Sequence, residues 1–182
     1  MFLYSIKLNK GIMAKSNPET TIEMQNLVIT PEDLLKHWQG HRSVTRKVIE
    51  AFPEHELFNY SIGGMRPFAQ LVMEMFGMAT PGMQGIVSRK WDKFADTSGL
   101  HTKKDLLDRW DQTTKEINEY WTQIPEGRFQ ENDVAFGQYE GLIYTTLFYF
   151  IDNEIHHRGQ GYVYLRSLGI EPPAFWDRGI FG

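Results

Sequence analysis

Two adjacent histidines, His156 and His157, lie inside a helical pattern that covers residues 152–166 with the sequence DNEIHHRGQGYVYLR. Imidazole nitrogens bind divalent metals and transfer protons near neutral pH. Neighbouring residues of an α-helix point about 100 degrees apart, so the two histidines cannot serve one site equally. His157 shares a helix face with Asn153, whereas His156 lies on the side of Gln160. We therefore expect His157 to face the interior, as a hydrogen-bonded core residue or as a ligand, and His156 to face the edge or a partner.

Glu74 and a second pair of histidines are the other candidates. Glu74 stands among apolar residues in the segment LVMEMFGM, so its carboxylate is either on the solvent side of a helix or buried with a partner. His37 and His41 are four residues apart, and this spacing can place two imidazoles on one metal ion. No third ligand accompanies them, so the pattern favours a structural role for both.

Several catalytic signatures are absent from the sequence. The IGGM segment at residues 62–65 lacks the GxxxxGK pattern of a phosphate-binding loop, and no GxSxG nucleophile elbow occurs. The chain has no cysteine, which excludes disulfides, thiolate metal sites and cysteine nucleophiles. Nothing in the sequence indicates a nucleotide cofactor.

Four helical segments must position these residues. They are expected from Thr30 to about residue 52, from about Pro67 toward Trp91, from Thr102 to about Pro125 and from about Leu142 to Leu168. Thr30 and Thr102 are suited to cap the first and third helices. Pro81 interrupts the second segment, which predicts a kink or a helix in two pieces.

The expected fold class is all-α, an antiparallel four-helix bundle. Long helices joined by connections must each bury one apolar stripe, and a bundle is the economical way to do so. Strand alternation is weak everywhere, and the segment RFQENDVAFGQYEG at residues 128–141 is expected to be a polar connection. Residues 1–29 are expected to form a partly flexible N-terminal extension, with Met1 or Met13 as the natural start, and residues 30–182 to form the bundle.

Composition limits the surroundings in which the protein works. The formal net charge of the 182 residues is -4, and no basic block occurs, which argues against sequence-independent nucleic-acid binding. No stretch reaches about 18 continuous apolar residues, so no membrane span is expected. The N-terminus lacks the features of a signal peptide. Together with the lack of cysteine, these features lead us to expect a cytoplasmic protein.

Two segments resemble a known family. HHRGQGYVYLRSLGIEPP looks like the fourth-helix signature of the DinB (damage-inducible) superfamily of bacterial four-helix bundles, and GGMRPFAQLVMEMFGM looks like its second-helix segment. The resemblance covers roughly residues 30–176. It implies a metal site of three histidines, one on the second helix and two, four residues apart, on the fourth. The matching positions here are Glu74, Asn153 and His157, so the chain departs from the histidine triad at two of three positions.

This departure leaves two interpretations of the site. A carboxylate, an amide oxygen and one imidazole can hold zinc, nickel, iron or manganese, with a lower affinity for soft metals. Alternatively the three side chains form a hydrogen-bonded relic in which Glu74 accepts from Asn153 and His157. Both interpretations bring the three side chains together, and we favour the metal-free or weakly binding state.

The resemblance also implies a function and leaves an alternative open. Some members of the family look like metal-dependent enzymes of the thiol-dependent transferase or hydrolase type, in which the metal activates a thiol or water. The alternative is a non-catalytic, stress-related bundle that has lost the metal and binds a small molecule or forms a dimer. Aromatic residues that are expected to be exposed, at Trp91, Trp121, Phe175 and Trp176, favour a homodimer.

Overall fold

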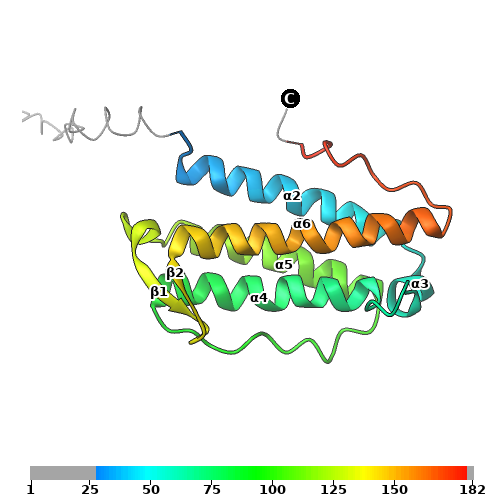
Figure 1. The fold of residues 1–182 in the computed structure, drawn as a ribbon, viewed down its shortest axis with the longest axis horizontal. Helices are drawn as coiled ribbons and strands as arrows, with labels where there is room; N and C mark the ends of the chain where they lie inside the picture. Colours follow the sequence, from blue (N-terminus) through cyan, green and yellow to red (C-terminus); the bar gives the residue numbers. More distant parts are fainter. Residues whose placement is uncertain (1–27, 180–182) are drawn as a thin grey trace, which may run out of the picture.

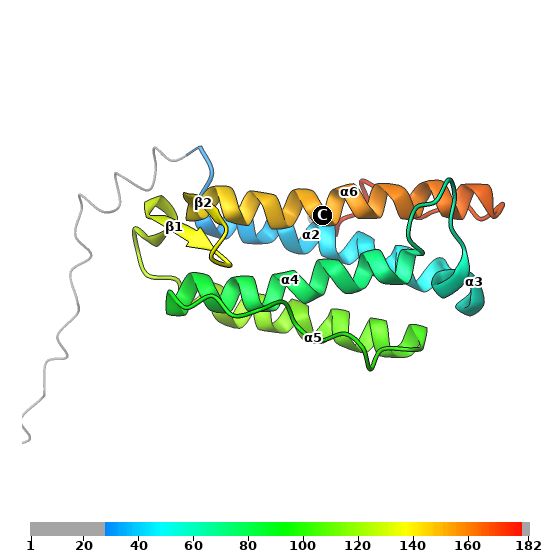
Figure 2. The same cartoon turned by 60° about the horizontal axis from the view of Figure 1, so that its bottom comes forward.

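Four long helices lie side by side in the computed structural model, which describes residues 28–179 (Figures 1 and 2). They are α2 (Pro31–Ala51), α4 (Phe68–Ser88), α5 (Lys103–Trp121) and α6 (Ile143–Ser167). Helix α4 packs against α5 and α6, and α2 packs against the same two helices from the other side. None of the described helices is long and apolar enough to cross a membrane. The expected N-terminal extension lies outside the described residues, apart from Val28 and Ile29.

Two capping boxes begin α2 and α5, and their caps are the predicted residues Thr30 and Thr102. The Thr30 hydroxyl accepts a hydrogen bond from the Asp33 backbone N–H at 3.0 Å, and the Asp33 carboxylate accepts from the Thr30 N–H at 3.1 Å. Thr102 and Asp105 repeat this exchange at 3.1 and 2.9 Å. Each box satisfies backbone donors that the first helical turn leaves unpaired, so both helix starts are locally determined.

A small β-hairpin corrects the expectation of a purely helical protein. Strands β1 (Asn132–Ala135) and β2 (Tyr139–Leu142) pair antiparallel inside the segment that was expected to be a polar connection. A short 3-10 helix, η1 (Arg128–Gln130), precedes them, and α3 (Glu54–Asn59) is a further short helix that the sequence did not predict. The strands have four residues each and only Ala135 is buried, so they leave almost no alternation to detect.

Helix α4 continues through Pro81. Of the two predicted forms, a kink or a helix in two pieces, the second is therefore wrong. Proline has no N–H and cannot bond the carbonyl four residues earlier, which here belongs to Gly77. The backbone N–H of Ala95, in the loop after α4, donates to that Gly77 carbonyl at 2.9 Å. The group that Pro81 releases is therefore satisfied from outside the helix, and the bond ties the loop to α4.

Aromatic rings pack directly against helix glycines in the core. A Cβ atom at Gly161 would lie 2.5 Å from the Phe68 ring, and one at Gly82 would lie 2.4 Å from the Phe150 ring. The space beside Gly161 is thus filled by the Phe68 ring. Trp121 is also buried, with its ring 6.3 Å from that of Trp38, which corrects its expected exposure.

A buried ion pair connects α2 to α6. The Arg42 guanidinium donates to the Glu154 carboxylate, and both side chains are almost fully buried. Arg42 also donates to the Trp110 carbonyl of α5 at 3.1 Å, while the Trp38 indole N–H donates to Glu154 at 3.0 Å. Because all these groups are paired, the charges are tolerated in the core.

Two glycines of α6 provide a matched stability test of this packing. We expect Gly161→Ala to lower the free energy of unfolding by about 1–3 kcal/mol, because the added methyl overlaps the Phe68 ring. Gly159→Ala, whose Cβ meets nothing within 4 Å, should raise it by up to about 1 kcal/mol through helix propensity. Urea denaturation of both variants measures the difference. Equal stability of the two would mean that Phe68 moves aside at no cost.

Candidate functional site

The three residues singled out by the sequence meet between α4 and α6. The His157 Nε2 lies 2.9 Å from the Glu74 Oε1, and the Asn153 amide donates to the same oxygen at 3.3 Å. His157 is buried and points inward, whereas His156 is exposed. The helical phase of α6 therefore indicated correctly which histidine faces the interior.

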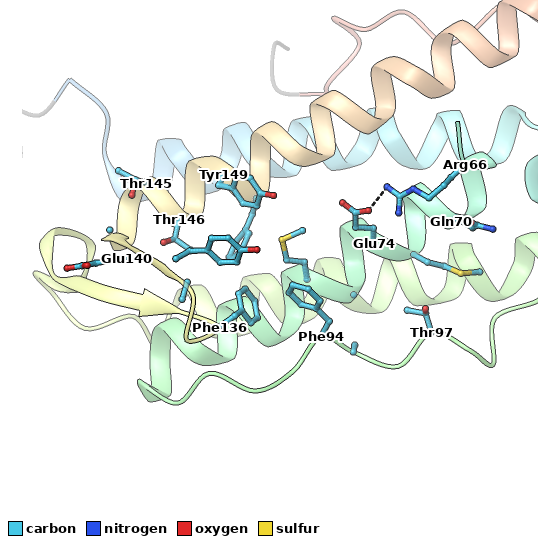
Figure 3. Close-up of a pocket in the computed structure, with 18 residues that line it drawn as sticks. Arg66, Gln70, Glu74, Phe94, Thr97, Phe136, Glu140, Thr145, Thr146 and Tyr149 are labelled. Carbon is cyan, nitrogen blue, oxygen red and sulfur yellow. Dashed lines mark ion pairs between the residues drawn. The ribbon is translucent and has the colours of Figure 1, made fainter. Parts of the chain in front are cut away.

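Arg66 is a fourth member of this group, and sequence reasoning missed it. Its guanidinium Nη2 lies 2.6 Å from the Glu74 Oε2, an ion pair drawn as a dashed line in Figure 3. The residue precedes Pro67 at the start of α4, and its backbone carbonyl accepts a hydrogen bond from the Tyr164 hydroxyl at 3.0 Å. The only signal in the sequence was that a carboxylate in an apolar segment needs a partner.

These contacts determine the charge state of Glu74. Burial raises the pKa of Glu74, but hydrogen bonds from His157, Arg66 and Asn153 outweigh it and leave the pKa below its usual value. The carboxylate is therefore ionised at neutral pH, and its affinity for a proton is reduced. Glu74 is well suited to accept hydrogen bonds and poorly suited to act as a strong general base.

Gln160 joins the two histidines of the opening motif. Its amide oxygen lies 3.1 Å from the His157 Nδ1, and its amide nitrogen lies 3.2 Å from the His156 Nε2. His156 lies on another side of the helix, as predicted. It is nevertheless connected to His157 through the side chain of Gln160. Both ring nitrogens of His157 thus already face an oxygen atom, on Gln160 and on Glu74.

The donor set does not fit a tightly bound divalent metal. One feature favours a cation, because the buried Asn153 Oδ1 has no hydrogen-bond partner among the described residues. Against it, both Glu74 oxygens are engaged, and the Arg66 guanidinium already supplies the positive charge. Within residues 28–179 no three histidine, cysteine, aspartate or glutamate side chains are grouped so that they could hold a metal ion. Three neutral imidazoles bind zinc well, whereas a paired carboxylate and an amide are poor replacements.

In the second histidine pair, His41 is buried and His37 is exposed. The Nε2 atoms of His37 and His41 are 3.2 Å apart, but Arg158 points a guanidinium N–H at the His41 Nδ1 from 3.0 Å. Arginine is always a donor, so the neutral His41 ring carries its proton on Nε2, where a metal would bind. Burial and then the Arg158 charge lower the pKa of His41 to about 3. His41 therefore stays neutral as a hydrogen-bonded core residue.

A cavity of about 720 Å³ opens beside Glu74. Its walls are α4, α6, the hairpin and the loop that follows α4, as Figure 3 shows. Glu74 and Arg66 form one end, Glu140 lies at the other, and the residues between them are largely apolar or aromatic. His157 and Asn153 lie behind Glu74 and are not part of the wall. Glu74 is thus the one predicted site residue that a bound molecule would touch.

Comparisons with known proteins agree with this architecture. The model of the DinB family matches residues 24–178. A solved DinB-like protein from Bacillus subtilis has 18% sequence identity and a TM-score of 0.62, with 78% of this chain and 96% of that chain covered. One from Bacillus cereus has 18% identity and a TM-score of 0.65, with 79% and 95% covered. At this identity the likeness concerns the fold alone. No curated protein matches the chain.

Restoring the histidine triad tests the geometry of the site. We expect the double variant Glu74→His, Asn153→His to bind zinc and nickel at least about tenfold more tightly than the natural chain, because two neutral nitrogens then join His157. Calorimetric titration of both proteins measures this, and Glu74→Leu, Asn153→Leu is the control that offers no new ligands. Equal affinity of the double variant and the natural chain would show that the three positions do not converge on one ion. Tight zinc binding by the natural chain would contradict the poor fit of its donor set.

Proposed function

The chain belongs to the DinB family, and from this premise we propose that it binds a small, largely apolar molecule between α4 and α6 without a tightly bound metal. The cavity beside Glu74 carries the proposal. Its volume lies within the range of small-molecule sites, and its pattern of an apolar body with a few polar groups is typical of them.

Exposed aromatic side chains support a ligand in this cavity. Phe94, Tyr139 and Tyr149 belong to its wall, and they are 57%, 61% and 57% exposed. Removing apolar surface from water stabilises a complex by about 25 cal/mol per Å², so an apolar molecule that covers the exposed part of these rings would be stabilised. Their grouping around one cavity is the arrangement expected of a ligand site rather than of scattered surface residues.

A metal-dependent transferase or hydrolase is the second candidate function. The observation that favours it is the unpaired Asn153 Oδ1, a buried acceptor next to His157 and Glu74. The Arg66 ion pair and the lowered pKa of Glu74 weigh against it, because they leave neither an open carboxylate nor an effective base. We therefore rank binding above catalysis for this chain.

We also propose that the chain is an antiparallel four-helix bundle and that it works in the cytoplasm. The packing of α2 and α4 against both α5 and α6 supports an antiparallel four-helix bundle. The chain has no cysteine, which is compatible with the reducing cytoplasm that we propose as its location.

A homodimer is the proposed assembly. Phe175 and Trp176, which follow α6, are 55% and 66% exposed and meet edge to face with ring centroids 5.1 Å apart. Trp91, named with them from the sequence, is half-buried against Phe136 and contributes less. Large exposed rings that lie together are typical of an interface.

Sedimentation velocity tests the assembly. We expect a species of twice the 21.2 kDa chain mass, and we expect Phe175→Ser, Trp176→Ser to shift it toward the monomer. Phe148 is also exposed but lies on α6, so Phe148→Ser is the matched control and should leave the dimer intact. A monomer at high protein concentration would refute the dimer.

Binding of the neutral fluorescent probe N-phenyl-1-naphthylamine tests the ligand site. The natural chain should bind it, and Thr146→Phe should weaken binding at least about tenfold, or 1.4 kcal/mol, because the new ring fills the cavity. Thr122→Phe, at an exposed position after α5, is the matched control and should bind the probe like the natural chain. Undiminished binding by Thr146→Phe would place the probe elsewhere and contradict the proposal.

A further inference from the structure

We infer that the cavity selects an amphipathic monocarboxylate, a molecule whose carboxylate pairs with Arg66 and whose apolar body lies against the aromatic residues. This inference rests on the proposed function, because it names the chemical class of the ligand at the same site.

Arg66 has guanidinium N–H donors that pair with no other described residue. Its side chain is half exposed, and within the described part of the chain its guanidinium makes one contact, from Nη2 to the Glu74 Oε2. A guanidinium carries five N–H donors in a planar fork and can pair with a carboxylate along a second edge. The remaining donors of Arg66 are therefore available to a ligand at the end of the cavity.

The Glu74 carboxylate has hydrogen-bond partners besides Arg66. Its Oε1 accepts from the Asn153 amide at 3.3 Å and lies 2.9 Å from the His157 Nε2. Arg66 can turn toward a ligand while the buried side of the carboxylate keeps these contacts. Asn153 and His157 thus hold one oxygen of Glu74 and Arg66 the other, and in Figure 3 Arg66 lies on the side of Glu74 away from Phe136 and Tyr149.

A cationic ligand gains less at this end. An ammonium group that bound the Glu74 Oε2 would lie next to the Arg66 guanidinium, which already pairs with that oxygen, and the two positive charges would repel each other. A carboxylate instead forms new charge-assisted bonds with donors that now face solvent. The end of the cavity beside Arg66 therefore favours an anion.

The far end of the cavity limits the ligand to one charge. Arg66, Glu74 and Glu140 are the only charged residues of the wall, and Glu140 lies opposite the other two. Its carboxylate accepts from the Asn132 amide at 3.1 Å and points away from Phe136 and Tyr149 (Figure 3). The negative charge of Glu140 disfavours a second anionic group at this end, whereas an apolar tail meets methionine and aromatic side chains along the way.

Displacement of N-phenyl-1-naphthylamine by three ten-carbon molecules tests the inference. Decanoate, decan-1-ol and decylamine share the same tail and differ in charge, and each is used below its micellar concentration at constant ionic strength. We expect the natural chain to bind decanoate at least about tenfold more tightly than either of the others, as a charge-assisted pair allows.

Variants of Arg66 connect the preference to one side chain. Arg66→Gln should abolish the advantage of decanoate over decan-1-ol, and Arg166→Gln, at an exposed arginine of α6 outside the wall, should leave this advantage and the binding of both molecules unchanged. Arg66→Lys keeps a cation near Glu74, so it still tests the inference if Arg66→Gln does not fold. It should retain part of the preference, because a lysine pairs as a point charge and not as a fork.

The possible outcomes separate the inference from the proposed function. Equal or tighter binding of decan-1-ol or decylamine, or a decanoate preference that survives Arg66→Gln, would overturn the carboxylate assignment while the cavity remains a binding site. If the natural chain binds neither the probe nor any of the three molecules, the proposed function itself fails.

Discussion

The buried pair of Arg42 and Glu154 is the constraint on which the arrangement of the helices depends. Its charges are almost fully removed from water, and burial raises the pKa of Glu154 and lowers that of Arg42. The pair is tolerated because Trp38, Thr114 and the Trp110 carbonyl complete its hydrogen bonds, and Arg42 also lies 4.0 Å above the Trp110 ring. Loss of one partner from such a pair lowers the free energy of unfolding by about 3–5 kcal/mol. The pair and its hydrogen bonds therefore fix how α2, α5 and α6 are rotated about their axes relative to one another.

This rotation positions the candidate site. Asn153 and His157 lie about 60–100 degrees around α6 from Glu154, on the same side. When Glu154 faces α2, these two side chains face α4 and reach Glu74. The opposite wall of the cavity depends on a different constraint, because the carbonyl that Pro81 releases at Gly77 binds Ala95 and fixes the loop along α4.

The two departures from the family's histidine pattern change what the site can do. An imidazole at position 74 would present a nitrogen lone pair, whereas the carboxylate of Glu74 attracts Arg66 and becomes part of an ion pair. The positive charge that a metal would bring is then supplied by the protein itself. Such a site retains polarity at one end of an apolar cavity, which is the reason why we propose ligand binding and rank it above activation of a thiol or water.

Local signals in the sequence determined most of the fold. Caps and periodic apolar stripes depend on residues within a few positions of one another, so Thr30, Thr102 and the phase of His157 on its helix were readable without the structure. The family signature in the second and fourth helices came from the same local segments and led to Glu74, Asn153 and His157.

Only the tertiary structure decided which faces meet. The ion pair of Arg66 with Glu74, the Phe68 ring against Gly161, the burial of Trp121 and the cavity itself all follow from how separate segments pack. The hairpin also belongs to this group, because strands of four mostly exposed residues carry little pattern and are stabilised by the helices beside them.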